Sequence, residues 1–152
     1  MFRNEYQYSF THLARELSSG QRFPELTDED AAYVLDFVAQ KKTGGHACLN
    51  ETSIMLAIDG EHVRMDRMHE VDGVSRHRTD DLQKRGIGIH GPCSFWLTDH
   101  PDSYEGHHPD GASARIGRVL LRRRIAYQIE ACRLLKADDR VLEWREEWNR
   151  KW

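Results

Sequence analysis

Apolar residues at helical spacing predict two helices in the first 42 residues. The first stripe runs from Phe10 to Leu17, and Gly20 supplies a stop signal behind it. The second stripe follows Thr27, a good capping residue, and its first turn is acidic, as the helix dipole favours. The stripe residues are Phe10, Leu13, Ala14 and Leu17 in the first helix, and Ala31, Val34, Leu35 and Val38 in the second.

The middle of the chain changes pattern and predicts a small sheet. Residues 54–58 are an unbroken apolar run, residues 62–68 alternate between polar and apolar, and the Asp59-Gly60 pair between them is typical of a β-hairpin turn. Further candidates are two short strands, 87–89 and 94–97, and a two-turn helix, 79–86.

Turn-forming residues fill positions 99–111 and predict a long loop. Residues 112–136 then contain no proline and predict a long helix, and a break near Ala137 precedes a second helical segment toward Trp152. The predicted fold class is α+β: two N-terminal helices, a small, mostly antiparallel sheet, and a long C-terminal helical segment packed on one face. We expect a single domain over residues 1–152.

Composition narrows the protein class. The chain is 39% hydrophobic, and it has neither an apolar run long enough to span a membrane nor an apolar N-terminal segment of the kind found in secretory signals. Its three cysteines, Cys48, Cys93 and Cys132, are too widely spread for a disulfide scaffold. These features predict a cytoplasmic protein without a membrane partner.

Charge is distributed unevenly along the chain. Residues 1–110 hold 11 basic and 19 acidic side chains, for a net charge of -8, whereas residues 111–152 hold 11 and 6, for a net charge of +5. A basic C-terminal part favours acidic or phosphate-bearing partners. Alternatively, the two parts of the chain pack together and neutralise each other.

Two short clips combine histidine with cysteine. His46 and Cys48 follow a Gly-Gly turn, and His90 and Cys93 follow a Gly-x-Gly segment. Two thiols and two imidazoles are the ligands that tetrahedral zinc prefers, so zinc is a possible cofactor, and no other cofactor is expected. The alternative is that these are ordinary buried or surface side chains.

The predicted loop 99–111 is rich in histidine and acid. Such side chains can hold a divalent metal with open positions for hydrolysis. A solvated, turn-rich loop is the alternative interpretation. The candidate metal ligands here are His100, His107, His108 and Asp110, with Asp102 and Glu105 nearby.

A basic stripe is predicted along the long helix. If residues 112–140 form one helix, six basic side chains fall within a sector of roughly 60°. Guanidinium groups bind phosphates or carboxylates through two parallel hydrogen bonds. A solvated face, or one paired with the acidic part of the chain, is the alternative. The stripe consists of Arg115, Arg118, Arg122, Arg133, Lys136 and Arg140.

The terminal segment carries a tryptophan seam. Val141, Trp144, Trp148 and Trp152 recur at spacings of three and four, which is typical of an amphipathic helix. Core packing is one use of such a seam. Tryptophan with arginine is also typical of interaction hot spots, so a partner groove or a homodimer contact is the other use.

No catalytic motif is complete in the sequence, and this favours a non-enzymatic function. The leading interpretation is a small intracellular binding or regulatory domain that engages nucleic acid or an acidic protein surface through the basic stripe and the tryptophan seam. One alternative is a metal-dependent hydrolase or nuclease that uses loop 99–111 or the two His/Cys clips. A second alternative is a self-assembling structural subunit.

Overall fold

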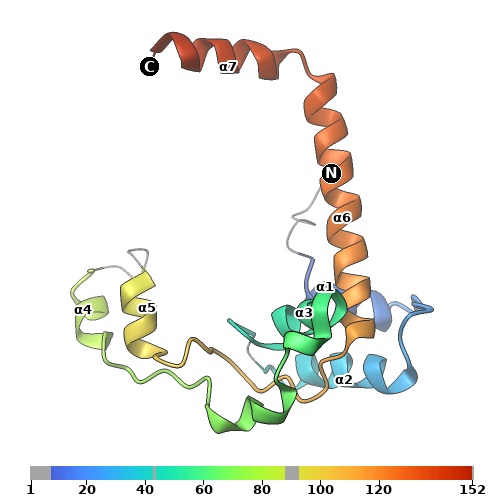
Figure 1. The fold of residues 1–152 in the computed structure, drawn as a ribbon, viewed down its shortest axis with the longest axis vertical. Helices are drawn as coiled ribbons and strands as arrows, with labels where there is room; N and C mark the ends of the chain where they lie inside the picture. The colour runs from blue at the N-terminus through green and yellow to red at the C-terminus, as the bar shows by residue number, and fades with distance from the viewer. Residues whose placement is uncertain (1–7, 43, 88–92, 152) are drawn as a thin grey trace.

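The computed structural model describes residues 8–42, 44–87 and 93–151, with the backbone alone at position 83 and at positions 93–95. Within these ranges the secondary structure is helical (Figure 1), and the single β-type contact is an isolated antiparallel bridge between Gly73 and Gly106. The predicted α+β fold with a sheet is therefore wrong. In chain order the elements are α1 (Phe10–Ser18), α2 (Asp28–Ala39), α3 (Leu49–Asp59), η2 (Gly60–His62), η3 (Met65–Glu70), α4 (Asp80–Lys84), α5 (Cys93–Asp99), α6 (Ala114–Ala137) and α7 (Arg140–Lys151).

The two predicted N-terminal helices are confirmed as α1 and α2. Thr27 begins α2 with a reciprocal cap, in which the amide of Asp30 donates to the Thr27 hydroxyl at 3.2 Å and the amide of Thr27 donates to the Asp30 carboxylate at 3.0 Å. The stop at Gly20 is also observed, because this glycine adopts φ +89° just after α1. Local sequence signals were sufficient to predict that these two helices form.

The predicted hairpin is replaced by α3 and two short 3-10 turns. An apolar run of five residues fits a buried strand or a buried helix equally well, and tertiary packing decides between them. Leu49 and Ser53 lie one turn apart on α3 and are fully buried. They face α6 at Gly117, where an added Cβ would lie 1.8 Å from the Ser53 carbonyl oxygen. The two helices cross so closely that position 117 requires glycine, and this packing favours a helix over the predicted strand for residues 54–58.

The other predictions for the middle of the chain had mixed outcomes. The helix predicted at 79–86 is confirmed as α4, and the loop at 99–111 is confirmed because no helix or strand is described between α5 and α6. Residues 94–97 form part of helix α5, so the strand expected there is wrong. Most of the strand expected at 87–89 lies outside the described residues.

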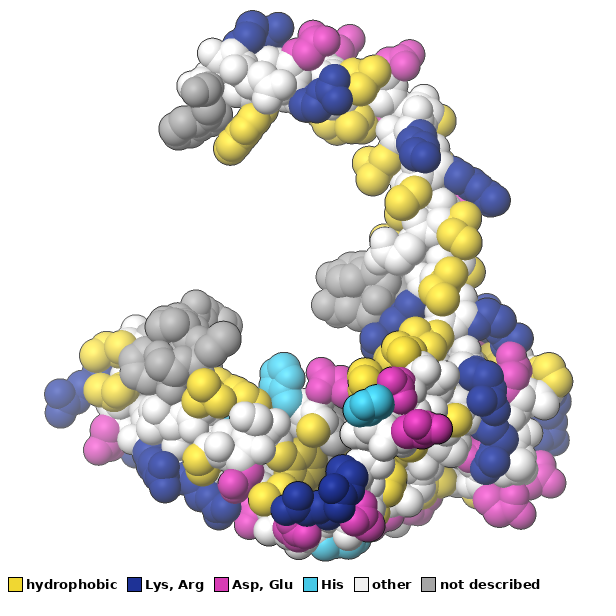
Figure 2. All heavy atoms as spheres, in the orientation of Figure 1, with side chains coloured by type: hydrophobic (Ala, Val, Ile, Leu, Met, Phe, Trp, Pro, Cys, Tyr) yellow, Lys and Arg dark blue, Asp and Glu magenta, His cyan; other side chains and the backbone are white. Residues whose placement is uncertain are grey.

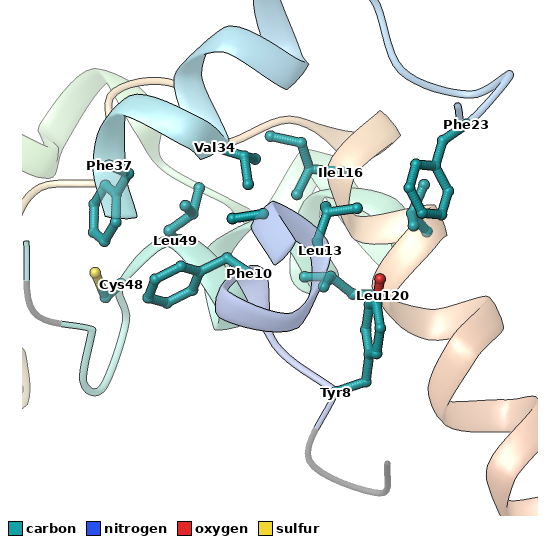
Figure 3. Packing of buried hydrophobic residues seen from close by; sticks show 12 residues of the cluster. Tyr8, Phe10, Leu13, Phe23, Val34, Phe37, Cys48, Leu49, Ile116 and Leu120 are labelled. Atoms are coloured by element: carbon teal, nitrogen blue, oxygen red, sulfur yellow. The ribbon is translucent and has the colours of Figure 1, made fainter. Parts of the chain in front are cut away.

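A single hydrophobic core joins α1, α2, α3 and the first turns of α6 (Figure 3). Phe10 meets Phe37 edge to face, with ring centroids 5.0 Å apart, and Leu13 is fully buried between the helices. From α6 the apolar side chains of Ile116, Val119 and Leu120 enter this core fully buried. The next turn binds the body through Arg122, Arg123 and Arg124, and the helix then leaves the body (Figure 1). The C-terminal helical segment is therefore packed on the body only at its start.

Across the described residues, no helix combines the length and the apolar character needed to cross a bilayer.

Candidate functional site

A histidine and a glutamate meet where α3 begins. The Nδ1 atom of His46 lies 3.5 Å from the Glu51 Oε1 atom, and the amide of Ala47 donates to Glu51 Oε2 at 2.7 Å. Ala47 adopts the left-handed backbone conformation, φ +57°, which turns the chain sharply into the helix. Buried Cys48 and Leu49 anchor this turn in the core. The two side chains are half exposed, so solvent reaches them.

Trp96 of α5 lies over this pair. Its ring contacts His46 edge to face, with centroids 4.6 Å apart, and stacks on His100 at 5.6 Å with an interplanar angle of 25°. Its indole N–H donates to Glu105 Oε2 at 2.7 Å. The amide of Glu105 in turn donates to the His46 carbonyl at 3.0 Å. Four residues from two distant parts of the chain are thus connected.

Two glycines allow the backbones to approach at this site. A Cβ at Gly45 would lie 2.4 Å from the Glu105 carbonyl oxygen, and a Cβ at Gly73 would lie 2.3 Å from the Gly106 carbonyl oxygen. Side chains at either position would push the 105–106 segment away. The glycines therefore position the wall of the site.

A cavity of about 540 Å³ opens beside Glu105. Its polar lining includes Asp72, Ser75, His100, Glu105, His107 and His108. His100 is only 9% exposed, and its Nδ1 atom has no hydrogen-bond partner among the described residues. A buried, unsatisfied polar atom on a cavity wall is a candidate contact for a ligand.

The structure describes the side chains of only two of the four residues in the predicted zinc clips, His46 and Cys48. The Cys48 thiol is buried and donates to the His107 carbonyl oxygen at 2.9 Å, and burial raises its pKa, which opposes the thiolate that zinc needs. His46 is engaged instead by Glu51 and Trp96. His90 and the side chain of Cys93 lie outside the described residues.

Two of the four ligands predicted in the loop share His69 as a partner, and the other two contact different rings. His100 stacks on Trp96, and the His107 ring meets Phe37 at 6.4 Å. The His108 ring packs on His69 at 4.6 Å, and Asp110 Oδ1 pairs with His69 Nε2 at 3.0 Å. Across the described residues, no three His, Cys, Asp or Glu side chains converge as a metal site would require.

Sequence reasoning missed Glu51 and Trp96 as site residues. Glu51 lies five residues after His46, a spacing that brings the two together only if a helix begins between them. Trp96 was assigned to a strand, so its contact with His46, 50 residues earlier, had no local signal. His69 was also missed, because no local pattern in the sequence links it to its partner Asp110.

The predicted basic stripe is broken and largely paired. Helix α6 ends at Ala137, so Arg140 belongs to α7 and the six residues do not share one helix. Four of them form ion pairs: Arg115 with Asp30, Arg122 with Glu25, Arg133 with Glu130, and Arg140 with Asp138. In the described part of the chain, Arg118 and Lys136 form no ion pair. The alternative of pairing with the acidic part of the chain holds for Arg115 and Arg122.

The ion pair at Asp30 is the one with a buried carboxylate. Burial alone opposes ionisation of Asp30, but hydrogen bonds from Arg115, Thr27 and Ser113 outweigh this and lower the pKa of its carboxyl to about 2. The pair fastens the start of α6 to the start of α2. Arg115 therefore has a structural role.

The tryptophan seam does not pack into the core. Trp144 and Trp148 are 56% and 63% exposed, and no residue of α7 is buried. Trp152 lies outside the described residues. Core packing is therefore excluded for the two described tryptophans.

Comparison with known families adds one finding. The family model of creatininase, described as creatinine amidohydrolase, matches residues 5–132. No curated protein and no solved structure matches the chain significantly. The match overturns the leading interpretation of a non-enzymatic binding or regulatory domain, because the family is one of hydrolases. Such hydrolases are generally metal-dependent, which agrees with zinc as a possible cofactor.

Proposed function

Because this chain belongs to the creatininase family, we propose that it hydrolyses an amide bond of a small molecule at the His46–Glu51 pair. The observation that carries the proposal is the pair itself, which lies within the residues that match the family. Neither side chain of the pair lines the 540 Å³ cavity, but Glu105, which contacts His46, does. Glu105 connects the two features, because it lines the cavity and its amide binds the His46 carbonyl. The sequence predicted a hydrolase as an alternative function, with its site at loop 99–111 or at the His/Cys clips. The proposal keeps the hydrolase but places the reaction at His46 and Glu51.

The pair has the geometry of a carboxylate that orients an imidazole. Glu51 Oε1 lies 3.5 Å from His46 Nδ1, and a carboxylate at this position favours a proton on Nδ1 and leaves Nε2 as the basic atom. In the proposed step, Nε2 removes a proton from water as the water oxygen bonds to the amide carbon. The same proton then passes to the amide nitrogen as the carbon–nitrogen bond breaks. The step leaves a carboxylic acid and an amine, which remain on one ring-opened molecule when the amide is cyclic.

The cavity supplies groups that would hold the substrate. In the tautomer with a proton on Nδ1, His100 donates to the carbonyl oxygen of the amide, where negative charge develops. The carboxylates of Asp72 and Glu105 supply acceptors for substrate N–H groups. Trp96 restricts the motion of His46 by ring contact and excludes water from that side.

Among the described residues, no complete metal site is formed. His46 and Glu51 offer two donor groups, whereas catalytic zinc usually has three protein ligands. The proton transfers proposed above therefore rest on side chains of this chain. Metal dependence is a separate measurement: activity after treatment with chelator and after addition of zinc.

The test is hydrolysis of creatinine and of other small cyclic amides, followed by NMR. His46→Gln and Glu51→Gln should each lower kcat by about 100-fold or more, since each removes part of the proton-transfer pair. His62→Gln is the matched control, because His62 forms a similar pair with Asp59, at 2.9 Å, on the exposed end of α3. This control should keep full activity.

Three results would contradict the proposal. Turnover that survives both site substitutions would remove the pair from catalysis. An equal loss in the His62→Gln variant would indicate a general effect of histidine loss. Absence of turnover for every amide tested, with and without zinc, would reject amide hydrolysis.

A further inference from the structure

After Arg124, whose guanidinium donates to the Tyr8 carbonyl, α6 leaves the body and continues with α7 as an arm, residues 125–151 (Figure 1). The arm exposes large apolar side chains over its whole length, as Figure 2 shows. They are Ile125, Ile129, Leu134, Leu135, Leu142, Trp144 and Trp148. Isolated helices of this length are marginal in water, and contiguous apolar surface marks an interaction site.

One face of the arm is both apolar and basic. Leu121, just before the arm, and Ile125, Ile129 and Cys132 within it recur at spacings of four, four and three, so they form one stripe along α6. Shallow apolar grooves follow this stripe on the surface. Basic side chains border it, and α6 as a whole holds seven Lys and Arg against one Glu. The bordering residues with no ion pair in the described chain are Arg118, Arg124 and Lys136, of which Arg124 donates to the Tyr8 carbonyl.

The family match does not account for much of the arm. It ends at residue 132, before the last turns of α6 and all of α7. The exposed apolar surface of the arm therefore extends beyond the residues that the family model covers.

The body carries a surface of complementary character on α3. Met55 and Ile58 are 45% and 63% exposed. Exposed Asp59 and Glu61 follow Ile58 in the chain, and Asp59 pairs with His62 at 2.9 Å. A basic and apolar arm and an acidic and apolar surface thus occur in one polypeptide. Since α6 is a continuous helix that leads away from the body, the arm cannot fold back onto its own α3.

We propose that the arm of one chain docks on the α3 surface of a second copy, reciprocally, to give a two-fold dimer. Ile125 and Ile129 of the arm pack on Met55 and Ile58 of the partner copy. Two-fold symmetry forms this contact twice, which is the commonest way in which identical chains associate. The charges bordering the two surfaces are opposite, which favours this pairing over contact between two basic arms.

Sedimentation velocity across the micromolar range tests the proposal. The wild-type chain should reach twice its 17.8 kDa mass at high concentration. Ile129→Glu on the arm and Ile58→Glu on α3 should each raise the dissociation constant about tenfold or more, because each buries an unpaired charge in both contacts. Gln21→Glu, which adds a charge at an exposed position that belongs to neither proposed surface, is the control and should leave the dimer intact.

A mixing experiment identifies which surfaces meet. Each of the two variants alone has two defective contacts. An equimolar mixture of Ile129→Glu and Ile58→Glu chains can form a heterodimer in which one contact is fully wild type. Dimer should therefore reappear on mixing, and it should weaken as salt is raised, since opposite charges border the contact.

Several outcomes would overturn the proposal. A wild-type chain that stays monomeric throughout the range excludes the dimer. A dimer that is abolished by Ile129→Glu but unaffected by Ile58→Glu shows that arms pair with each other. Circular dichroism on each variant confirms that the exposed substitutions leave the helices folded.

Discussion

In the helical body the fully buried side chains are mainly apolar, whereas the segment between α3 and α6 buries the polar residues Thr79, Asp99 and His100. The body is held together by contact between helices, with α3 against α6 and α1 against α2. The segment is held instead by hydrogen bonds between side chain and backbone. The candidate site lies where the two meet, with His46 and Glu51 anchored to the body and Trp96 and Glu105 supplied by the segment.

Asp99 illustrates how the segment is built. Its carboxylate accepts from the amides of Arg78, at 2.6 Å, and Thr79, at 3.1 Å, and from the Thr79 hydroxyl. The Thr79 side chain in particular lowers the pKa of this carboxyl, since the bonds favour its charged form. These bonds join the end of α5 to the start of α4. Local stability of this kind is smaller than that of a packed core, so we expect the segment to open before the body.

The largest effect is expected from Gly117→Ala, which attacks the body. The added methyl group would collide with the Ser53 carbonyl, and the two helices would have to separate. We expect a loss of about 3 kcal/mol in the free energy of unfolding, measured by urea denaturation. Gln128→Ala, on an exposed face of the same helix, should change it by less than about 0.5 kcal/mol. Equal stability of the two variants would show that α3 and α6 do not depend on this close crossing.

A smaller effect is expected at the ion pair between α2 and α6. The folded pKa of Asp30, about 2, lies below the model-compound value of 3.8, so its stabilisation is present above about pH 4 and is lost as the pH falls toward 2. Asp30→Asn should cost about 2 kcal/mol at neutral pH and flatten this part of the pH profile. Asp28→Asn, exposed in the same turn, is the control and should cost less than about 1 kcal/mol. If the free energy of unfolding of Asp30→Asn fell between pH 4 and pH 2 as it does in the wild type, the Asp30–Arg115 pair would not contribute to stability.

The smallest global effect is expected from Asp99→Asn, which attacks the segment. Loss of the charged acceptor should cost about 1 kcal/mol in total stability. Hydrogen exchange at the amides of Arg78 and Thr79 should nevertheless accelerate by about tenfold, because their acceptor is weakened. The amide of Leu49 in the body should exchange at its wild-type rate. Uniform acceleration at all three positions would show that the segment and the body unfold together.

Local sequence determined the parts of the fold whose signals are local. The stripe of α1, the cap at Thr27 and the turn residues of 99–111 each specify a structure within a few residues, and each prediction was confirmed. The stripe of α2 predicted the helix but not its whole buried face, because Leu35 is exposed and Phe37 is buried instead. The start of the long C-terminal helix was also predictable, since Ser113 caps it by accepting from the Ile116 amide at 3.2 Å.

Tertiary structure decided what depends on contacts between distant residues. An apolar run at 54–58 became a helix because α6 packs on it at Gly117. Arg115 became part of an ion pair because folding brings it to Asp30, 85 positions earlier in the chain. His46 acquired Trp96 and Glu105 as neighbours in the same way. Spacing along a chain sets which side chains share one helix face, but only packing sets which faces meet, and the candidate site is formed by faces that meet.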